Sequence, residues 1–404
     1  MKIWIEIDAE RLAGNLAALR RASSQPGDAA SELAVLSVVK ADAYGHGVTA
    51  CAPILARAGA EWLGVTDAQE GALVRTTLAE AGIAPAQQPA ILIMSGIMGS
   101  REEVELIVRH RLTPTVWDPQ HLALLSDAAR RLDAEHLIPV HLELDTGMAR
   151  QGVGCATALA HLLDILMTTP QLYLDGVFTH FASTEVAHSG QTLDQERRFE
   201  AAVAQIAYAG LRPRWVHTGN SSFIDNAEGP GGLPWLRSVA AKLSAQPMVR
   251  AGLALYGYLL PIEGAGEEDA ALVQAKVSPV MAWKTRVIGL RELEAGATVG
   301  YNGIFVTNRT MRLALLPVGY ADGLRRELSG SNTKPGGWVM IRGERCPIVG
   351  RISMNLTMVD VSSIADVVLG DSVTLLGDGI TADDHARLAN TIAYEIVCGV
   401  KSRP

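Results

Sequence analysis

The sequence predicts an α/β protein, a (β/α)8 barrel of the TIM type followed by a smaller, mostly β domain. At 404 residues the chain is too long for one ordinary compact core and suits a large barrel with a second domain. Between residues 34 and 255, short apolar runs alternate with stretches of helical periodicity, which is typical of repeated βα units. After Pro261 the pattern changes to short alternating segments separated by glycine and proline. We therefore expect a barrel over residues 9–262 and a β-rich domain made of residues 1–8 and 272–404.

Eight runs in the first part of the chain have the length and composition of barrel strands. Between them, apolar residues recur three and four positions apart with charges in between, as in Val104–Arg111 and Leu193–Tyr208, which predicts covering helices. Reactive groups of such barrels lie at the carboxyl ends of the strands and in the loops that follow. The expected strands are Ala34–Lys40, Trp62–Val65, Ala90–Ser95, Thr113–Trp117, Ile138–Asp145, Tyr173–His180, Trp215–Gly219 and Met248–Leu253.

The two ends of the chain are expected to form the second domain. Lys2–Asp8 has the alternation of a strand, and Ala9–Ala22 has the pattern of an amphipathic helix with Asp8 as its N-cap. No helix precedes this strand, so it can join the C-terminal sheet. An exposed acidic connector, IEGAGEEDA, is expected at residues 262–270. The other elements expected here are strands Met281–Leu290, Met311–Val318, Trp338–Ile341 and Ser372–Leu376 and a helix near Ala382–Ala393.

Composition and charge exclude several classes of protein. With 48% hydrophobic and 19% charged residues, the chain resembles folded globular enzymes. A formal charge of -8 without a long basic run argues against a nucleic-acid partner. No apolar run of about 18 residues occurs, and Glu6 and Asp8 interrupt the place of a secretory signal, so we expect a soluble cytoplasmic protein that does not bind a membrane. The four cysteines lie far apart without CxxC spacing, so we expect free thiols and assign no metal site.

A candidate reactive lysine stands at the end of the first expected strand. Lys40 is followed by a Gly-rich polar loop, Ala41–Gly47. An unperturbed lysine has a pKa of about 10.4 and is a poor nucleophile at neutral pH, whereas a desolvated lysine near other cations can form an imine with an aldehyde. A lone lysine here is more simply explained as a solvated surface residue. Lys40 becomes a candidate because further polar groups are expected at the same end of the barrel.

The fifth expected strand alternates polar and apolar residues. His141, Glu143 and Asp145 share one face, while three apolar residues share the face expected under the helices. The polar face should therefore point into the barrel, where unpaired charge is costly. Arg150, beyond a turn at Gly147, is the expected counter-charge. A purely structural network of ion pairs stays open as the alternative explanation.

The seventh and eighth expected strands end in HTGNS, residues 217–221, and VRAGL, residues 249–253. The loops after these two strands commonly form the phosphate site of such barrels. The Ser221 hydroxyl and the amides of Gly252 and Leu253 can hold a phosphate dianion; an ordinary turn, with glycine only for its backbone conformation, is the alternative. Arg250 and His180 are expected to point at the space between these loops and Lys40.

Several motifs together identify a resemblance. The chain resembles the bacterial alanine racemases, the barrel class of pyridoxal-phosphate enzymes, over essentially its whole length. Because the motifs are independent and stand in the family's order, a chance match is negligible. They are VVKADAYGHG (38–47), DTGMAR (145–150), THFAS (179–183), HTGNSS (217–222), VRAGLALYG (249–257), GYNGIF (300–305), LPVGYADG (316–323) and VGRISMN (349–355).

The resemblance implies a homodimer with shared active sites and pyridoxal 5'-phosphate as cofactor. Lys40 resembles the cofactor-binding lysine and first base, and Tyr301 the second base, which acts across the dimer interface on the opposite face of the substrate. Arg250 matches the arginine facing the pyridine nitrogen, which should weaken electron withdrawal and discourage transamination. The other matches are His180 beside the ring, Arg150 near the phenolic oxygen, Tyr44, Asn220, Ser221, Gly252, Leu253 and Tyr394 for cofactor and phosphate binding, Met354 at the substrate carboxylate and Tyr320 at the substrate entrance.

Two positions depart from the family's pattern. Glu143 stands where many members carry a lysine that becomes carbamylated beside the residue matched by Arg150, and Asn355 stands where the family often has aspartate. Because Glu143 already presents a carboxylate, our hypothesis is that it replaces the carbamate in orienting Arg150. The Asn355 change, beside the expected substrate carboxylate, leaves the preference for the substrate's side chain open.

The activity expected from the resemblance is the interconversion of L-alanine and D-alanine, supplying D-alanine for peptidoglycan. One alternative is a broader racemase acting on serine or basic amino acids. A second is a pyridoxal-phosphate decarboxylase with a similar barrel, but VRAGLALYG stands where its Gly-rich phosphate loop is expected. A third is a non-catalytic barrel that binds pyridoxal phosphate, which would lack the C-terminal domain and Tyr301.

Overall fold

The computed structural model describes residues 2–24, 33–134, 136–226, 229–264 and 272–403. Most of the acidic connector expected at 262–270 lies outside these residues. The chain divides into two compact units, one made of Leu12–Ala43 with Val48–Ser278 and the other of Met1–Arg11, Tyr44–Gly47 and Pro279–Pro404.

Eight parallel strands close into a barrel in the first unit, as the sequence predicts. They follow one another in chain order, and the first strand pairs with the last to complete the ring. Their bounds are β2 (Ala34–Val38), β3 (Trp62–Val65), β4 (Ala90–Ile93), β5 (Thr113–Val116), β6 (Ile138–Glu143), β7 (Leu172–Phe178), β8 (Trp215–Thr218) and β9 (Gln246–Ala251).

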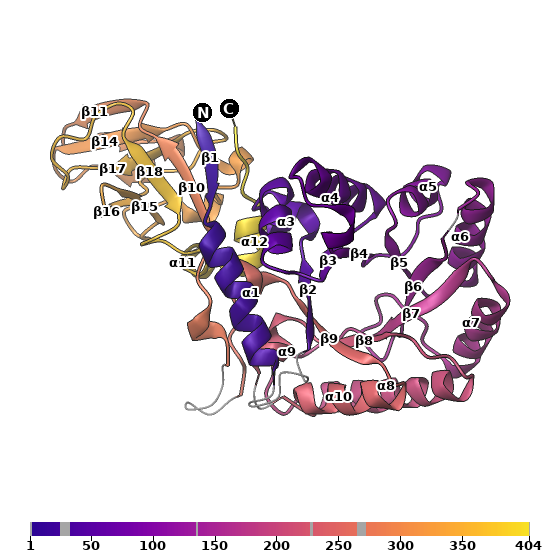
Figure 1. Cartoon of the computed structure of the whole chain (residues 1–404). Coiled ribbons are helices and arrows are strands. Elements are labelled where there is room, and N and C mark those ends of the chain that lie inside the picture. The colour runs from indigo at the N-terminus through magenta and orange to yellow at the C-terminus, as the bar shows by residue number, and fades with distance from the viewer. Residues whose placement is uncertain (1, 25–32, 135, 227–228, 265–271, 404) are drawn as a thin grey trace. The chain divides into compact units, whose positions relative to one another are not determined.

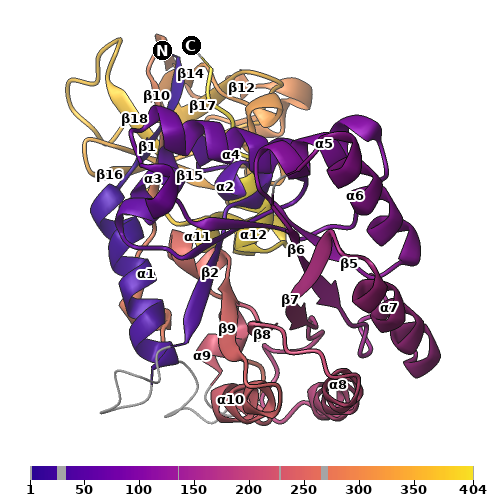
Figure 2. The same cartoon turned by 45° about the vertical axis from the view of Figure 1, so that its right-hand side comes forward.

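Helices cover the outside of this ring of strands (Figure 1). Figure 2 shows α7, α8 and α10 on the outer side of β7, β8 and β9. Several helices begin at a side chain that accepts a first-turn amide, including Asp67, Ser100, Asp118 and Ser189, which is the usual N-cap chemistry. The elements are α1 (Ala9–Ser23), α2 (Lys40–Tyr44), α3 (Val48–Arg57), α4 (Ala68–Glu80), η2 (Pro85–Gln87), α5 (Arg101–Arg109), α6 (Pro119–Arg131), α7 (Ala156–Thr168), α8 (Gly190–Tyr208), α9 (Ser221–Asp225), α10 (Gly232–Lys242), η3 (Leu253–Tyr256) and η4 (Gln274–Lys276).

Most barrel strands end one or two residues before their predicted ends. β2 ends at Val38 instead of Lys40, β6 at Glu143 instead of Asp145, and β7 at Phe178 instead of His180. Past these ends the regular ladder stops, although single cross-strand bonds continue: the Val39 amide donates to the Gly64 carbonyl and the Leu144 amide donates to the Phe178 carbonyl, each at 2.8 Å. The predicted reactive groups therefore lie in the loops just beyond the strands.

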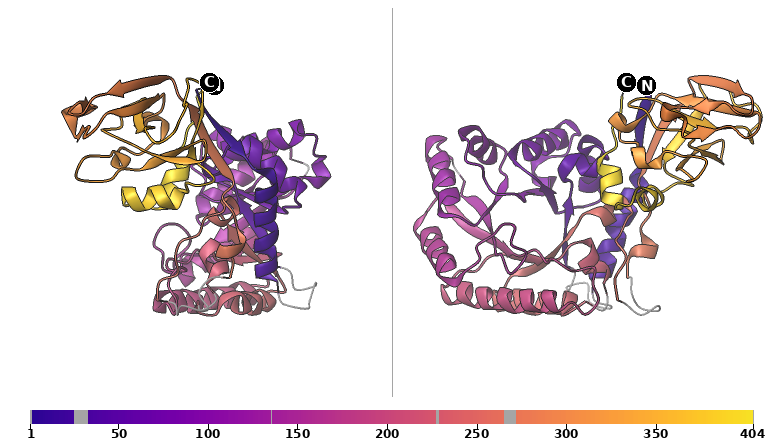
Figure 3. Two further views of the ribbon diagram at one scale, coloured as in Figure 1. Left: turned by 90° about the vertical axis from the view of Figure 1, so that its left-hand side faces the viewer. Right: turned by 180° about the vertical axis from the view of Figure 1, so that it is seen from behind.

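The second unit is mostly β and contains a five-stranded sheet in the order β1-β10-β18-β15-β16. β1 pairs antiparallel with β10, so the prediction that the first strand joins the C-terminal sheet is confirmed; the two strands run side by side in Figures 1 and 3. A three-stranded sheet, β11-β14-β17, and a hairpin, β12-β13, complete it. The strands are β1 (Ile3–Ile7), β10 (Met281–Arg286), β11 (Gly289–Leu293), β12 (Thr298–Val299), β13 (Phe305–Val306), β14 (Met311–Leu316), β15 (Trp338–Ile341), β16 (Glu344–Pro347), β17 (Thr357–Asp360) and β18 (Ser372–Leu376).

Two predictions for this unit are wrong in detail. The strand expected at Met281–Leu290 is divided into β10 and β11, which lie in different sheets. The helix expected at Ala382–Ala393 ends at Ala389, because Asn390 adopts a left-handed conformation with a φ of 54° that terminates it. The helical elements are η5 (Tyr301–Gly303), η6 (Tyr320–Asp322), η7 (Arg326–Leu328), α11 (Ala382–Ala389) and α12 (Ala393–Cys398).

Within the described ranges, no helix combines the length and the apolar character needed to cross a bilayer.

Candidate active site

Lys40 begins a left-handed turn at the start of the segment where the sequence predicts a Gly-rich polar loop. Residues 41–44 all have φ angles of 53° or 54°. Non-glycine residues avoid this region because it costs roughly 1–2 kcal/mol each, so the surrounding structure must hold them there. The Asp42 carboxylate accepts a 2.7 Å hydrogen bond from the amide of Val48 and closes the turn onto α3. The turn thereby fixes the backbone from which the Lys40 side chain extends.

A cavity of about 220 Å³ brings four predicted site residues together inside the first unit. It lies at the carboxyl ends of the barrel strands, where the sequence predicts the chemistry. It is lined by Lys40, Arg150, His180 and Arg250, together with Thr66, Met94, Ser95, Glu143, Gln151 and Phe178.

Arg250 is the buried cation of this cavity, with only 2% of its surface exposed. One terminal nitrogen donates to His217 Nδ1 at 3.0 Å. The other donates to the Thr179 carbonyl at 2.9 Å and to His180 Nδ1 at 3.0 Å. Burial lowers the pKa of Arg250 to about 10, and the negative charge of Glu143 opposes this shift. The guanidinium therefore stays charged at neutral pH.

Because a guanidinium has no acceptor, Arg250 fixes the proton positions of the histidines around it. His217 Nδ1 must accept, so its proton sits on Nε2 and points at His141 Nδ1, 2.9 Å away. His141 then carries its proton on Nε2, which faces Asp175 Oδ2 at 3.5 Å. Burial lowers the pKa of His217 and of His141, so both rings are neutral. In this series each group donates to the next: Arg250 to His217, His217 to His141, and His141 toward Asp175.

His180 is the other partner of Arg250, and it too is neutral. Burial lowers the pKa of His180 to about 3, and the positive charges of Arg250, Arg150 and Lys40 add to the shift. Since His180 Nδ1 accepts from Arg250, its proton sits on Nε2. His180 can therefore act as a hydrogen-bond donor in the cavity without carrying charge.

A bulge in the barrel makes room for the histidine series. The register between β6 and β7 shifts after Val140, so that Asp175 becomes the extra residue and His141 stands opposite Gly176. A Cβ atom at position 176 would lie 2.6 Å from the His141 ring. Only glycine fits this close approach.

Glu143 is buried in the cavity wall, where its Oε2 accepts a hydrogen bond from Gln151 Nε2. Burial raises the pKa of Glu143 to about 7, against the lowering effects of Gln151, Arg250 and Arg150. No ion pair within 4.0 Å joins Glu143 to Arg150 in the described part of the chain. The hypothesis of a direct pairing that orients Arg150 is therefore corrected, since Arg150 acts on Glu143 only through its nearby charge.

The prediction that Asp145 faces the barrel interior is wrong. Its Oδ1 accepts hydrogen bonds from the amides of Gly147, Met148 and Ala149, each at 3.0 Å. The residue lines a separate cavity with residues of α7 and α8. Strand alternation stops at Glu143, because a carboxylate two residues before a glycine turn binds the turn's amides instead.

The predicted phosphate residues of the barrel also lie together. Ser221 Oγ accepts hydrogen bonds from the amides of Gly252, at 3.0 Å, and of Ala254, at 3.2 Å. The Gly252 amide is thus directed at Ser221 itself. Asn220 is the N-cap of α9, where its Oδ1 accepts from the Phe223 amide at 3.1 Å. Leu253 begins η3 directly after Gly252.

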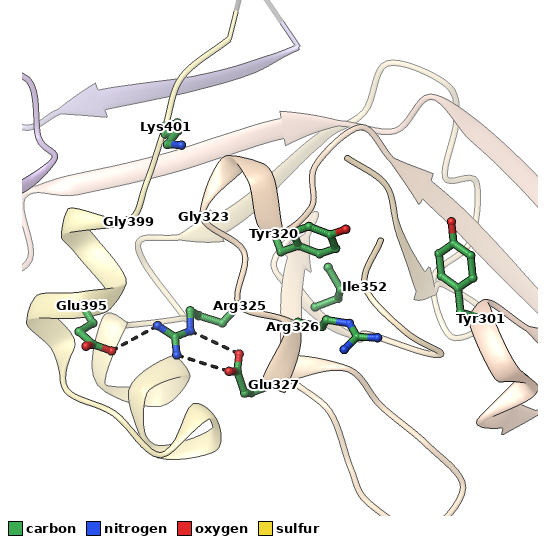
Figure 4. A pocket seen from close by; sticks show the side chains of 10 residues that line it. All are labelled: Tyr301, Tyr320, Gly323, Arg325, Arg326, Glu327, Ile352, Glu395, Gly399 and Lys401. Atoms are coloured by element: carbon green, nitrogen blue, oxygen red, sulfur yellow. Dashed lines mark hydrogen bonds and ion pairs between the residues drawn. The ribbon is translucent and has the colours of Figure 1, made fainter. Parts of the chain in front are cut away.

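In the second unit, Tyr301 and Tyr320 line one pocket of about 730 Å³ (Figure 4). Tyr301 is 66% exposed and Tyr320 is 45% exposed. Arg326 also lines the pocket, and Arg325 is held by Glu327 at 3.3 Å and Glu395 at 3.2 Å. The pocket therefore presents two phenols beside a wall of mixed charge.

Met354 lies on the loop that packs against η6. The Tyr320 amide donates to the Ser353 carbonyl at 3.2 Å, and the Ala321 amide donates to the Met354 carbonyl at 3.0 Å. A Cβ at Gly319 would lie 2.1 Å from the Ser353 oxygen, so only glycine allows this approach. These bonds bring two predicted substrate residues, Tyr320 and Met354, into one local structure.

Tyr44 and Tyr394, both predicted phosphate contacts, pack against each other in the second unit. Their ring centroids lie 5.9 Å apart. Burial raises the pKa of Tyr44, and the neighbouring Tyr394 adds to the shift, so its phenol is neutral.

Two glutamines were not predicted as site residues. Gln195 Nε2 donates to the His180 carbonyl at 2.9 Å and to Thr146 Oγ1 at 3.2 Å, so it ties together the loops after β6 and β7. The second is Gln151, whose Nε2 donates a hydrogen bond to Glu143 Oε2. The helical periodicity of the sequence could have identified Gln195. It lies on the buried face of α8 with Phe199, where an apolar residue is expected.

Comparisons with known proteins agree along the whole chain. The N-terminal domain of alanine racemase matches residues 7–260, and the C-terminal domain of alanine racemase matches residues 280–404. Alanine racemase from Nostoc sp. is 35% identical over 408 residues, which cover 100% of this chain and 94% of that protein. The solved structure of alanine racemase from Streptomyces coelicolor A3(2) is 30% identical, with a TM-score of 0.82 and coverage of 99% and 96%. That of alanine racemase from Bartonella henselae, with covalently bound pyridoxal phosphate, is 25% identical, with a TM-score of 0.75 and coverage of 100% and 98%. Because both domain models match and relatives are 35% identical over the whole length, the chain belongs to the alanine racemase family.

Proposed function

We propose that the protein is a pyridoxal-phosphate-dependent racemase that interconverts L-alanine and D-alanine. The observation that carries this proposal is the cavity that holds Lys40, His180 and Arg250 together, in a chain that belongs to the alanine racemase family. Provision of D-alanine for peptidoglycan and a cytoplasmic location are parts of the proposal that come from the family resemblance.

The residues of the first unit fit pyridoxal 5'-phosphate by their chemistry. Lys40 offers an amine to an aldehyde, and Arg250 offers a cationic donor to a pyridine nitrogen. Because Arg250 already donates to two histidines and a carbonyl, its guanidinium is held in place before any ligand arrives. When bound, the cofactor supplies an electron sink for the charge left at the substrate's Cα. The residues of this unit proposed to hold it are Lys40, His180, Asn220, Ser221, Arg250, Gly252 and Leu253. The family resemblance adds Tyr44 and Tyr394, which belong to the second unit.

Two side chains are proposed to move the proton. Racemisation removes a proton from one face of Cα and delivers one to the other, so it needs a carrier on each face. Lys40 and Tyr301 are the two carriers. His180 supports them as a neutral donor, and Arg250 keeps His180 in the tautomer that donates from Nε2. Arg150, Met354 and Tyr320 are the proposed substrate contacts.

A homodimer with shared active sites is part of the proposal. Lys40 belongs to the barrel unit and Tyr301 to the β-rich unit. Tyr301 is 66% exposed and lines one pocket with Tyr320, which is 45% exposed, and such exposed aromatic side chains suit a surface that a partner covers. Tyr301 of one protomer then serves Lys40 of its partner.

Loss of optical rotation from single enantiomers tests the activity. Purified protein is incubated with L-alanine, D-alanine and the enantiomers of serine and lysine, and the rotation is followed in time. We expect rapid loss for both alanine enantiomers. Serine or lysine racemised as fast as alanine would overturn the preferred substrate and favour a broader racemase, and no loss with any amino acid would favour a non-catalytic barrel.

Chemical trapping tests the cofactor. The purified protein is treated with borohydride, digested and mapped by peptide mass spectrometry. We expect a pyridoxyl adduct on the peptide that contains Lys40. A protein with bound cofactor but no adduct at this position would refute the assignment of Lys40.

A further inference from the structure

Gln151 joins the ends of two barrel strands through one side-chain nitrogen. Its Nε2 donates to the Met94 carbonyl, just beyond β4, at 2.8 Å. The same Nε2 donates to Glu143 Oε2 at the end of β6. An amide nitrogen has two N–H donors, and both are used here. The Met94 carbonyl thus anchors the amide in the position from which it meets the carboxylate.

The cavity around Glu143 is rich in positive charge. Lys40 after β2, Arg150 in the loop after β6 and Arg250 on β9 all line it. His180 after β7 also lines it and is neutral. Asp145, on the same segment as Glu143, is the nearby negative group. A carboxylate at Glu143 is therefore the counter-charge that the cavity wall supplies to three cations.

Burial works against that charge, and Gln151 is the main influence that preserves it. Burial raises the pKa of Glu143 to about 7, where the group is only partly ionised at neutral pH. The hydrogen bond from Gln151 opposes this rise most strongly, ahead of the charges of Arg250 and Arg150. An amide donor favours the ionised form, because that form is the better acceptor.

We propose that Gln151 is a positioning residue that keeps Glu143 as a negatively charged carboxylate, fixed in one orientation, beside Lys40 and Arg250. The inference deepens the proposed racemase function, since it assigns control of the charge in that same cavity to a residue outside the family motifs quoted above. Without the amide, the carboxylate takes up a proton and the three cations lose their counter-charge.

The proton affinity of Glu143 tests this directly. Protein labelled with ¹³C at glutamate carboxyl groups is titrated by NMR, and the Glu143 signal is assigned by its loss in Glu143→Gln. In Gln151→Met, which keeps the length of the side chain but has no donor, we expect Glu143 to bind its proton about tenfold more tightly. The matched control is Gln205→Met, since Gln205 donates to the Ala156 carbonyl at the surface, at 2.7 Å. Its Glu143 midpoint should equal that of the wild type.

A second variant keeps the test decisive if Gln151→Met does not fold. Gln151→Glu replaces the donor by a carboxyl group, so two carboxyls share one site and the upper midpoint of the pair should lie above that of the wild type. A Glu143 midpoint unchanged in the variant that folds overturns the inference.

Kinetics separate this inference from the proposed function. The pH profile of kcat/KM for alanine is compared between the wild type and Gln151→Met. In Gln151→Met the acid limb of this profile should move to higher pH, together with the NMR midpoint of Glu143. If Gln151→Met racemises alanine with an unchanged acid limb and an unchanged Glu143 midpoint, the inference about Gln151 is refuted and the proposed function still stands. Absence of racemisation would remove the proposed function, while the NMR titration still decides the role of Gln151.

Discussion

Glu143 gives the folded protein a pH dependence with a definite sign. Burial raises its pKa to about 7 in the folded state from about 4.5 in the unfolded chain. The folded state therefore binds this proton more tightly, so stability is fully present below pH 4.5 and is lost as the pH rises through 7. The two values correspond to about 3 kcal/mol lost by pH 8. Because desolvation outweighs the nearby positive charges, this buried carboxyl group destabilises the fold at the pH where it is ionised.

The substitution Glu143→Gln should remove this dependence, because an amide does not titrate. We expect the unfolding temperature of Glu143→Gln to fall less than that of the wild type between pH 5 and 8, measured by scanning calorimetry. We also expect lower racemase activity and weaker cofactor retention, because the cations lose their counter-charge. Parallel stability curves would contradict the pKa argument, and unchanged kinetics would discard a functional role for Glu143.

At the scale of residues, the sequence could predict which side chains reach the cavity but not how they pair. Lys40, His180 and Arg250 lie in one cavity because each stands at the end of a parallel strand, and all such ends meet at one rim. Which side chains form hydrogen bonds depends on atomic positions to within a few tenths of an ångström, between residues that can be far apart in the sequence. For this reason Gln151 was missed as the partner of Glu143, and Asp145 was assigned to the wrong face.

The bulge between β6 and β7 places a specific demand on one glycine. His141 is completely buried and is held between His217 and Asp175, so it cannot move away from a new atom at position 176. We expect Gly176→Ala to lower stability by about 1–3 kcal/mol through overpacking. It should also lower kcat/KM, because displacement of His141 disturbs His217 and, through it, Arg250.

Chemical denaturation and racemase kinetics of Gly176→Ala measure both effects. Gly154→Ala is the matched control, since a Cβ there meets nothing within 4 Å. Wild-type stability in Gly176→Ala would show that the histidine ring has room to relax, and would remove the argument for a rigid series of donors.

One ion pair secures the segment that carries Tyr320. Arg403 Nε lies 2.9 Å from Asp322 Oδ1, whose side chain is only 3% exposed. Asp322 Oδ2 also accepts from the Gly319 amide at 3.0 Å and from Asn355 Nδ2 at 3.3 Å. The loops that bear Tyr320 and Met354 therefore meet at one buried carboxylate. The departure at Asn355 supplies a donor to Asp322 where an aspartate would add a second carboxylate.

Loss of this partner should be costly. We expect Arg403→Met to lower stability by about 2 kcal/mol, because it leaves a buried carboxylate without its counter-charge. The KM for alanine should rise more than kcat falls, since the affected loops carry proposed substrate contacts. Denaturation and steady-state kinetics measure the two effects. Arg309→Met, which breaks an exposed pair with Asp360, is the control and should change little; equal effects of the two variants would contradict the argument.

At the scale of elements, hydrophobic periodicity predicted the strands well and their ends less well. Trp62–Val65, Trp338–Ile341 and Ser372–Leu376 match the structure. The boundaries that differ depend on backbone conformations that periodicity does not encode, such as the left-handed turn at residues 41–44 and the left-handed Asn390. Such positions are decided by local hydrogen bonds.

At the scale of the whole molecule, the candidate site residues are divided between two units. Lys40, Arg250 and Ser221 belong to the barrel, whereas Tyr301 and Met354 belong to the β-rich unit. The sequence could predict both architectures, because strand alternation and βα alternation are local patterns. It could not derive the partnership of Lys40 with Tyr301 from those patterns, since no periodicity links a barrel rim to an exposed phenol. The proposed dimer supplies that link, because Tyr301 of one protomer then serves Lys40 of its partner.

Mixing two inactive variants tests the proposed dimer. Lys40→Ala and Tyr301→Phe should each abolish racemisation, because each removes one proton carrier. If Tyr301 serves the Lys40 of its partner, a mixed dimer has one site that lacks both carriers and one site that is intact. Random exchange of equal amounts should then restore about one quarter of wild-type activity, because half of the dimers are mixed and each has one working site of two.

The measurement is the racemisation rate after the variants have been unfolded and refolded together. Each variant refolded alone is the control and should stay inactive. If the two carriers belonged to the same protomer, every site in a mixed dimer would lack one of them, and no activity would return. Recovery of activity thus requires a site built from two chains, whereas its absence, with mixed dimers demonstrated by mass spectrometry, would refute the shared site and leave the barrel cavity to be explained within one protomer.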